Sequence, residues 1–557
     1  MYLFRSLLLT AGLGFSLLQA QVAAPRNWFH MDARQDNFPG ISSEALYRRL
    51  QALSGNKRET VVVAVIDSGV DFEHEDLKDV MWKNPGEIPG DGKDNDGNGY
   101  IDDVHGWNFI GNAKGENIHH DNLEITRLVA AYRKTFAGTD GATLRGKKKK
   151  EYTLFKEMEE KVLSERKSLE ESWPTYKALK EAVGRLVRQL GKERDITAED
   201  IARVDPGSDE LLIRLIKILK RQMDQGATFE GFIGQLDQAY SYFDGRLNYN
   251  YNPDYDPRQL VGDHYADETE KYYGNGDVRG PDAEHGTHVA GIIGAVRGNG
   301  LGMDGIADNV RIMSVRTVPD GDERDKDVAN AIRYAVDNGA KVINMSFGKG
   351  YSPSKRTVDE AVRYAGQKDV LLVHAAGNDG SENDGTNNFP NDRYANRALF
   401  GPRHAGNWLE VGAADWEGKE NLAASFSNYS KSWVDLFAPG VDIYSTVVGS
   451  SYSNMQGTSM ASPMVAGAAA LLRSWFPDLT AGQVKKILMA SAVRQDAQVR
   501  KPGSESEKVP FASLSVTGGL LNIEAAFEKA LTTPGKKTGV SRALTAGSLP
   551  ARKVLIP

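Results

Sequence analysis

The sequence predicts an α/β fold in which a doubly wound, mostly parallel sheet carries a large helical insertion. Three runs rich in Val, Ile and Leu indicate the sheet, at 61–66, 342–345 and 370–376. Continuous apolar runs of this length are typical of strands buried on both faces, as in parallel sheets covered by helices. Apolar segments that begin after His285 and after Ser459 predict two of the covering helices.

Length and composition limit the class of protein. At 557 residues the chain is too long for one compact core, so at least two structural units are expected. The net charge of −7 is mild and favours neither a nucleic-acid partner nor a membrane surface. Because the chain has no cysteine, it has no disulfide, no thiolate nucleophile and no Cys-ligated zinc. Composition leaves the oligomeric state open.

Residues 1–20 predict a signal peptide. Arg5 supplies the positive charge, and the mostly apolar stretch Leu7–Leu18 is too short to span a bilayer as a mature helix. Ala20 is the expected cleavage position, and no later run is long enough for a membrane span. The mature protein is therefore expected to be exported, as a periplasmic or secreted protein.

A turn that leads into a helix is predicted around Ser459. The residues are Gly457-Thr458-Ser459-Met460-Ala461-Ser462-Pro463, followed by the apolar run 464–472. Proline is tolerated in the first helical turn, so Pro463 places the helix start close to Ser459. A hydroxyl there lies beside unpaired backbone N–H groups at the positive end of the helix dipole, which suits attack on a carbonyl. Alone, the motif also fits a serine that only caps the helix.

An acid and a base are predicted at the ends of two other segments. Asp67 follows a buried strand, where open α/β sheets place their ligands, although Asp-Ser-Gly is also ordinary turn sequence. His285 precedes an apolar helix and can act as base and acid near neutral pH. The alternatives for His285 are a structural histidine and a zinc site shared with His288. That pair lacks the glutamate and the spacing of a His-Glu-x-x-His helix.

Together, these three segments resemble the subtilisin-like serine proteases. The resemblance rests on Ala64–Gly69, His285–Gly291 and Gly457–Pro463, and on their order along the chain. It implies that Ser459 is the nucleophile, His285 the base, and Asp67 the carboxylate that orients the base. His288 matches a family position that is not catalytic.

Two more segments match the family. Val370–Gly380 predicts a buried strand and a turn, and the resemblance places the oxyanion-hole asparagine at Asn378. Ser346, Phe347 and Gly348 match a segment that lies beside the substrate as an antiparallel strand, a mode of recognition that uses main-chain hydrogen bonds. Without the resemblance, the two segments fit a turn and one more core strand.

The chain departs from the family between Asp67 and His285, which are much farther apart than in typical subtilases. The segment 119–255 predicts helices, because Leu186 and Leu190, like Leu215 and Leu219, follow helical spacing. Thr197 and Asp200 have the spacing of a capping box. A helical hairpin or small bundle is expected. Its role is open among a decorative subdomain, a lid, a docking surface and an internal inhibitor.

The predicted organisation has five parts. They are the signal peptide (1–20), the first part of the catalytic domain (21–118), the helical insertion (119–255), the second part of the catalytic domain (256–530) and a flexible tail (531–557). Residues 21–60 are too few for the propeptide domain that many subtilases carry, so they are expected to extend the catalytic domain.

The acidic segment Asp91–Asp103 predicts a structural calcium site. Counted from Asp94, the spacing of a calcium-binding EF-hand loop assigns ligands to Asp94, Asp96, Asn98, the Tyr100 carbonyl and Asp102. The twelfth position is His105 instead of glutamate, so another carboxylate is needed, and Asp103 is a candidate. The alternative is a solvated cluster of turns.

The sequence therefore predicts an exported serine endopeptidase that hydrolyses peptide bonds in proteins through an acyl-enzyme. Its expected partners are protein or peptide substrates, and the chemistry needs no cofactor. Two alternatives are a catalytically silent subtilase-fold binding scaffold and a calcium-regulated structural protein.

Overall fold

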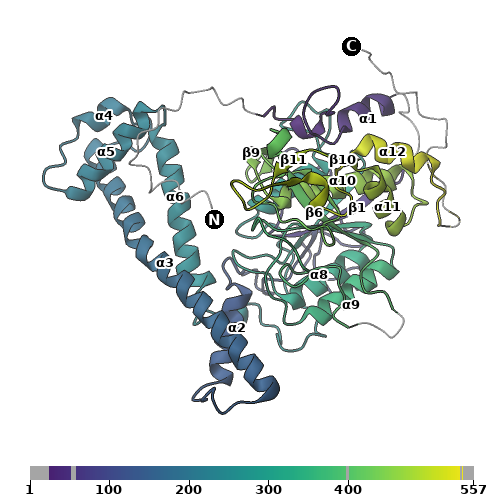
Figure 1. The fold of residues 1–557 in the computed structure, drawn as a ribbon, viewed down its shortest axis with the longest axis horizontal. Coiled ribbons are helices and arrows are strands. Elements are labelled where there is room, and N and C mark those ends of the chain that lie inside the picture. The colour runs from purple at the N-terminus through teal and green to yellow at the C-terminus, as the bar shows by residue number, and fades with distance from the viewer. Residues whose placement is uncertain (1–23, 52–57, 397–400, 538, 540–541, 543–557) are drawn as a thin grey trace.

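The computed structural model describes residues 24–51, 58–396, 401–537, 539 and 542. The predicted signal peptide and most of the predicted tail lie outside these residues. Figure 1 shows an α/β body from which a long arm of helices projects on one side.

A mostly parallel sheet forms the centre of the body. Its nine strands are β1 (Val61–Asp67), β2 (Gly106–Asn108), β3 (Val310–Arg316), β4 (Val342–Met345), β5 (Leu371–Ala375), β6 (Trp408–Ala414), β7 (Leu436–Pro439), β10 (Val493–Arg494) and β13 (Gly519–Leu520). Their order is β10-β13-β7-β6-β5-β4-β1-β3-β2, and only the edge pair β10–β13 is antiparallel. Two antiparallel pairs lie apart from this sheet, β8 (Ile443–Val447) with β9 (Ser451–Met455) and β11 (Gln498–Arg500) with β12 (Lys508–Pro510).

The order of the strands reverses between β1 and β4. From β1 the chain continues to β2 and then β3 on one side, and from β4 it continues to β5 on the other. Ile66 of β1 lies opposite Met345 of β4, so Asp67 and Ser346 leave the same edge of the sheet next to each other. In open α/β sheets, ligands bind at such a switch point, outside the carboxyl ends of the strands. The predicted doubly wound α/β fold is confirmed.

Helices cover both faces of the sheet. They are α1 (Ser43–Leu50), α7 (Glu284–Gly294), α8 (Asp325–Asp337), α9 (Lys355–Gln367), α10 (Thr458–Trp475), α11 (Ala481–Ser491) and α12 (Ile523–Thr532). Helices α7 and α10 pack on one face, and α8 and α9 pack on the other. The pair α8 and α9 lies on the side of the sheet opposite α10 in Figure 1. Along β1, Val63 and Val65 enter the core under α10, whereas Ala64 and Ile66 enter the core under α8. Burial on both faces explains why this strand is a continuous apolar run.

The residues before β1 pack into the same core. Trp28 and Phe29 are buried, together with Ile41 and Leu46. The Trp28 indole donates a hydrogen bond to the Asp442 carbonyl, 3.3 Å away. This segment therefore contributes to the core of the body instead of forming a core of its own.

The helical insertion is an arm with its own core. It contains α2 (Glu124–Thr135), α3 (Gly146–Leu190), α4 (Ala198–Arg203), α5 (Glu210–Asp224) and α6 (Phe229–Gly245). At 1.5 Å per residue, α3 is about 67 Å long. A separate apolar cluster at its far end includes Leu186, Leu215 and Leu219. The predicted capping box of Thr197 and Asp200 is present at the start of α4.

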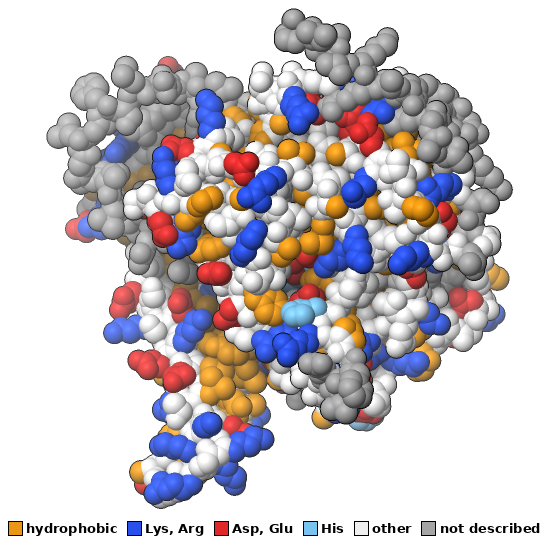
Figure 2. Space-filling view, turned by 45° about the vertical axis from the view of Figure 1, so that its right-hand side comes forward, with side chains coloured by type: hydrophobic (Ala, Val, Ile, Leu, Met, Phe, Trp, Pro, Cys, Tyr) orange, Lys and Arg blue, Asp and Glu red, His pale blue; other side chains and the backbone are white. Residues whose placement is uncertain are grey.

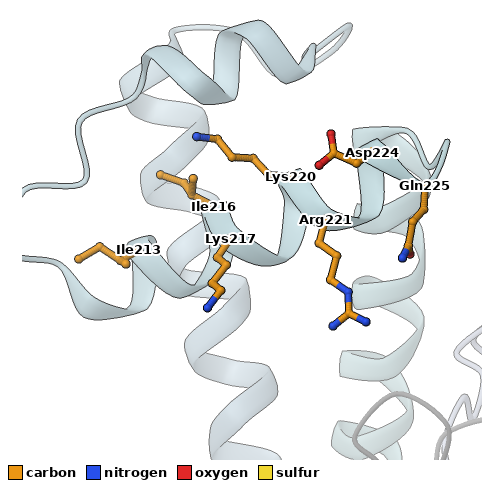
Figure 3. A pocket seen from close by; sticks show the side chains of 7 residues that line it. All are labelled: Ile213, Ile216, Lys217, Lys220, Arg221, Asp224 and Gln225. Atoms are coloured by element: carbon orange, nitrogen blue, oxygen red, sulfur yellow. The ribbon is translucent and has the colours of Figure 1, made fainter. Parts of the chain in front are cut away.

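The surface of the arm carries many charged side chains and also exposes apolar ones such as Leu163 and Ile213. Lys147–Lys150 lie exposed at the beginning of α3, as expected for a solvated face. Lys and Arg side chains are abundant on the lower tip of the projecting part in Figure 2. A shallow hollow on α5 is lined by Ile213, Ile216, Lys217, Lys220, Arg221, Asp224 and Gln225 (Figure 3). Throughout the described ranges, none of the helices combines the length and the apolar character that crossing a bilayer requires.

Helix α12 continues to Thr532, into the segment predicted as a tail. The described residues beyond it contact the body. The Gln483 amide donates to the Pro534 carbonyl at 2.8 Å, and Arg542 forms an ion pair with Asp478 at 2.7 Å.

The burial of Trp28 predicts a large loss of stability on truncation. Trp28→Ala is expected to lower the free energy of unfolding by about 3–5 kcal/mol, because a fully buried aromatic side chain leaves a cavity. Chemical denaturation measures this change. Leu301→Ala, which removes an exposed side chain, is the control and should change the same quantity by about 0.5 kcal/mol or less. An equally small effect of Trp28→Ala would contradict the role of this segment in the core.

Candidate active site

The predicted site residues lie around the switch point of the sheet. Asp67 ends β1, and Ser346 follows β4. His285 lies in the first turn of α7 and Ser459 in the first turn of α10, and these two helices pack against each other. Asn378 follows β5, the next strand after β4. Five segments that are distant in sequence therefore converge on one edge of the sheet.

Asp67 and His285 form a close pair. The His285 Nδ1 atom lies 2.7 Å from Asp67 Oδ1, which also accepts a hydrogen bond from the Ser68 N–H at 2.8 Å. Asp67 is 1% exposed, whereas the His285 side chain is 39% exposed. A buried carboxylate thus holds one ring nitrogen, so that the proton belongs on Nδ1 and Nε2 is free to act as a base.

The environment raises the pKa of His285. Burial lowers this pKa, but the charge of Asp67 and its hydrogen bond more than offset the effect of burial, and the charge of Asp282 adds to the increase. The imidazolium form is therefore stabilised in the folded protein.

Glycine permits the close approach of α7 to β1. A Cβ atom on Gly286 would lie 2.1 Å from the Gly69 carbonyl oxygen and 3.2 Å from the Asp67 Cβ. Any other residue at this position would push the helix away from the strand. The glycine after His285 therefore belongs to the geometry of the Asp67–His285 pair.

Hydrogen bonds fix the start of α10 against the end of β4. The Ser459 hydroxyl donates to the Ser346 carbonyl at 3.0 Å, and the Ser346 hydroxyl donates to the Ser459 carbonyl at 2.8 Å. The Asn344 amide donates to the Ser346 hydroxyl at 2.9 Å and accepts from the Ser462 hydroxyl at 2.7 Å. Ser346 thus holds the segment around Ser459, a role that the sequence motif did not indicate.

The Ser459 hydroxyl does not donate to His285. In the part of the chain that the structure describes, no hydrogen bond joins these two side chains, and the Ser459 hydroxyl lies 3.0 Å from the Ser346 carbonyl oxygen. A hydroxyl turns readily about its Cβ–Oγ bond, and catalytic hydrogen bonds often tighten only when substrate binds. The structure therefore joins Asp67 to His285, and it keeps Ser459 next to Ser346.

The side chain of Asn378 is oriented by Thr458. Asn378 Oδ1 accepts hydrogen bonds from the Thr458 N–H at 2.9 Å and from the Thr458 hydroxyl at 3.0 Å. Since a backbone N–H can only donate, these bonds assign the oxygen of the amide and leave Nδ2 to face the other way. Thr458 was missed by sequence reasoning, although it lies inside the motif around Ser459.

A small space beside Gly457 is shared by two donors. A Cβ atom on Gly457 would lie 3.4 Å from Asn378 Nδ2 and 3.6 Å from the Ser459 backbone nitrogen. Two N–H donors that face one space can bind a negatively charged oxygen. The absence of a side chain at residue 457 keeps this space open.

Phe347 and Gly348 line the edge of the site. Phe347 is half-buried and Gly348 is exposed, whereas Ser346 is buried. A Cβ atom on Gly348 would lie 2.5 Å from Asn388 Oδ1, so glycine is needed here for close packing.

His288 has a structural role. It is fully buried, and its Nε2 lies 2.9 Å from the Ile443 carbonyl and 3.1 Å from the Ser453 carbonyl. Burial lowers the pKa of His288 to about 4, so the ring is neutral. Within the described ranges, the only group of side chains with the proximity of metal ligands does not include His285 or His288. The structure gives no support to the zinc alternative.

The acidic loop gathers a partly different set of carboxylates from the one predicted. Asp94 accepts hydrogen bonds from the Asn98 and Gly99 N–H groups, and Asp102 accepts from those of Gly90 and Gly92. Asn98 donates to Asp96 and Asp103, and Tyr100 is buried with its hydroxyl on the Lys271 carbonyl. These residues hold the shape of the loop.

Oxygen atoms of Glu87, Asp96 and Asp103 lie within 4.8 Å of one another. Asp103 is fully buried, and burial raises its pKa to about 6, with the charge of Asp96 adding to the increase. Glu87 is also buried, and its Oε2 atom has no hydrogen-bond partner among the described residues. Three clustered carboxylates with an unsatisfied buried oxygen fit a hard cation such as Ca²⁺. The sequence identified Asp96 and named Asp103 as a candidate, but it missed Glu87.

The Asp67–His285 contact predicts the sign of a pKa change. Asp67→Asn removes the charge that raises the pKa of His285, so this pKa should fall. Titration of the His285 ring by NMR measures the shift. Asp384→Asn, which alters an exposed loop, is the control. An unchanged His285 pKa in Asp67→Asn would show that the carboxylate does not govern the ring.

Comparisons with known proteins identify the family of this chain. The family model described as "Subtilase family" matches residues 58–508. The thermophilic serine proteinase of Bacillus sp. (strain AK1) is 41% identical over 242 residues, which cover 43% of this chain and 53% of that protein. Subtilisin Savinase of Lederbergia lenta is 38% identical over 209 residues, 37% of this chain and 70% of the relative.

A solved structure of a protease from Pseudoalteromonas arctica PAMC 21717 aligns with 30% sequence identity and a TM-score of 0.35, over 44% of this chain and 70% of the other. The chain spans about half the length of the first two curated relatives, 53% and 49%. Because the family model covers the body from before β1 to beyond α10, the chain belongs to the subtilase family.

Proposed function

We propose that this chain is an exported serine endopeptidase that hydrolyses peptide bonds in proteins through an acyl-enzyme. The observation that carries the proposal is the 2.7 Å contact of Asp67 with His285 at the switch point, beside the helix start that presents Ser459. The family membership and the names of the relatives support the same reaction. Export rests on the predicted signal peptide at residues 1–20.

In the proposed acylation step, the Ser459 hydroxyl turns from the Ser346 carbonyl towards His285. His285 Nε2 takes the proton while Ser459 Oγ attacks the carbonyl carbon of the peptide bond. The Asp67 carboxylate stabilises the resulting imidazolium, in agreement with the raised pKa of His285. The imidazolium then gives its proton to the leaving amine, and the acyl group remains on Ser459. Water attacks this ester with the same base, and the acid product leaves.

The negative charge that develops on the substrate oxygen has two proposed donors. Asn378 Nδ2 and the Ser459 N–H face the space beside Gly457, where the oxyanion would lie. Loss of one such donor lowers turnover by about 10²–10³, a magnitude known from a subtilisin. Because Thr458 holds the other end of the amide, the donor is oriented before substrate binds.

The substrate is proposed to lie as an extended strand along Ser346, Phe347 and Gly348. These residues follow β4 directly and lead away from the nucleophile, since Ser346 is bonded to Ser459. Exposed backbone at Gly348 can pair with the main chain of a peptide of many sequences. Protein and peptide substrates are the expected class for such a surface.

A bound calcium ion is proposed to stabilise the loop at Glu87, Asp96 and Asp103. When bound, the ion would neutralise the mutual repulsion of these carboxylates and satisfy the free oxygen of Glu87. It takes no part in the proposed reaction. In a chain without disulfides, a ligand that binds only the folded state adds stability.

The nucleophile assignment is tested by covalent labelling. A serine-directed fluorophosphonate should label the wild-type protein at Ser459, and Ser459→Ala should abolish labelling and lower peptide turnover by about six orders of magnitude, the value found in a subtilisin. Ser164→Ala removes an exposed hydroxyl on α3 and should leave both unchanged. Turnover that persists in Ser459→Ala would require a different nucleophile. A wild-type protein that neither reacts with the label nor cleaves peptides would favour the silent scaffold.

Calcium binding is tested by titration and thermal unfolding. Calcium should raise the midpoint of thermal unfolding, since a ligand at a hundred times its dissociation constant stabilises the folded state by about 2.7 kcal/mol. Glu87→Gln should weaken binding measured by calorimetry, whereas Asp91→Asn, a change in the same loop outside the group, should not. No heat of binding and no shift of the midpoint in the wild type would refute the site.

A further inference from the structure

The insertion is joined to the body beside the site. We call residues 119–127 and 246–252 the root of the insertion. The Asp121 N–H donates to the Asp320 carbonyl at 2.9 Å, and the Asp320 N–H donates to the His119 carbonyl at 2.8 Å. The root thus pairs with the segment that follows β3 and leads into α8.

Both segments of the root are hydrogen-bonded to the segment between β3 and α8. Asn250 Nδ2, from the returning chain, donates to the carbonyls of Asp121 and Asp320, both at 3.0 Å. Gly321 makes the close approach possible, because a Cβ atom there would lie 2.3 Å from the Asp121 carbonyl oxygen. The root is therefore held at a fixed distance from the body.

A buried lysine connects the root to the proposed substrate segment. Lys349 is the residue after Gly348, and its side chain is 1% exposed. Its ammonium group lies 2.8 Å from Glu124 at the start of α2, 2.8 Å from Asp325 at the start of α8, and 2.8 Å from the Glu323 carbonyl. Three acceptors from two other segments thus use the three donors of one ammonium group.

The charges of this cluster are fixed by their mutual contacts. Burial raises the pKa of Glu124, but Lys349 and Arg127 more than offset it and lower the pKa to about 2. Arg127 also donates to the Asp322 and Glu323 carbonyls, at 3.0 and 3.1 Å. Buried charged groups favour one geometry, because moving one of them would leave a buried charge without its oppositely charged partner.

The backbone of Lys349 has little freedom. Its N–H donates to the Phe389 carbonyl and its carbonyl accepts from the Phe389 N–H, both at 2.9 Å. Gly348 is therefore followed by a residue whose backbone and side chain are both anchored. On its other side, Ser346 is bonded to Ser459. The exposed segment between these anchors is the one along which the substrate is proposed to lie.

We propose that Glu124 and Lys349 are positioning residues for an extended peptide substrate, and that the root of the insertion supports the substrate-binding strand. This inference rests on the proposed function. Glu124 acts through Lys349 to set the position of Gly348, so that a peptide finds its main-chain partners already in place. The arm is then part of the binding machinery at its root, whatever its distal helices do.

The test compares long and short substrates. Glu124→Gln keeps the shape of the side chain but removes its charge, so the KM for a peptide of about eight residues should rise about tenfold, near the loss of one good main-chain hydrogen bond. Its kcat and its rate on a small ester, which does not reach Gly348, should stay within about twofold. Glu160→Gln makes the same change at an exposed residue of α3 outside the root and should change none of these values.

The outcomes separate this inference from the proposed function. If the wild type neither reacts with the fluorophosphonate nor hydrolyses the ester, the proposed function fails. If the wild type is active and folded Glu124→Gln keeps the wild-type KM for the long peptide, the positioning role is wrong. A uniform fall in the rates on both substrates would indicate a general structural defect and would also overturn it.

A second measurement uses the wild-type protein alone. When a peptidyl phosphonate is bound covalently at Ser459, amide hydrogen exchange in residues 119–127 should slow by about tenfold, together with that of residues 348–351. Exchange in α5, at the far end of the arm, should not change. Unchanged exchange in the root of a fully labelled enzyme would contradict the coupling, even if Glu124→Gln does not fold.

Discussion

The pairing of β1 between β3 and β4 is the constraint on which the site depends. The register of β1 with β4 brings Asp67 next to Ser346, although the two residues lie on opposite sides of the insertion in the sequence. After β1 the chain turns towards one edge of the sheet, and after β4 it turns towards the other. The segments that follow these two strands therefore diverge and leave room for a ligand. Every other site residue is positioned by a helix or loop packed on this point.

The first turns of two helices complete the arrangement. Helix α7 reaches β1 because Gly286 has no side chain, and α10 is bonded to β4 through the hydroxyls of Ser346 and Ser462. Since α10 is buried along almost its whole length and packs across several strands, its start cannot move without disturbing the core. The packing of the core therefore determines the position of Ser459 as much as the local motif does.

The long insertion interrupts the body at little cost in free energy. Loop closure becomes only slowly more unfavourable with length, and both ends of the insertion meet at the root. There the Asn250 side chain donates hydrogen bonds to Asp121 and to Asp320 of the body. The far helices of the insertion pack around a separate core. Contacts at the root involve the segments after β3 and β4, and these segments border the switch point.

The sequence by itself determined the fold class, and it placed Asp67 at the end of a strand and His285 and Ser459 at the starts of helices. The apolar run of β1 and the small residues around Ser459 are local signals, because burial on both faces and the start of a helix each require particular residue types. The helical character of the insertion also followed from local spacing, and the capping box at Thr197 is present. The carboxylates proposed to bind calcium differ in part from the set that the sequence predicted, since Glu87 comes from outside the motif.

Only the tertiary structure decided which side chains meet. Thr458 orients Asn378, Ser346 holds Ser459, and Lys349 joins Glu124 to Asp325, each through partners far away in the chain. No local pattern carries such information, because a hydrogen bond or a buried ion pair depends on the distance between atoms in space, and that distance is set by how strands and helices pack.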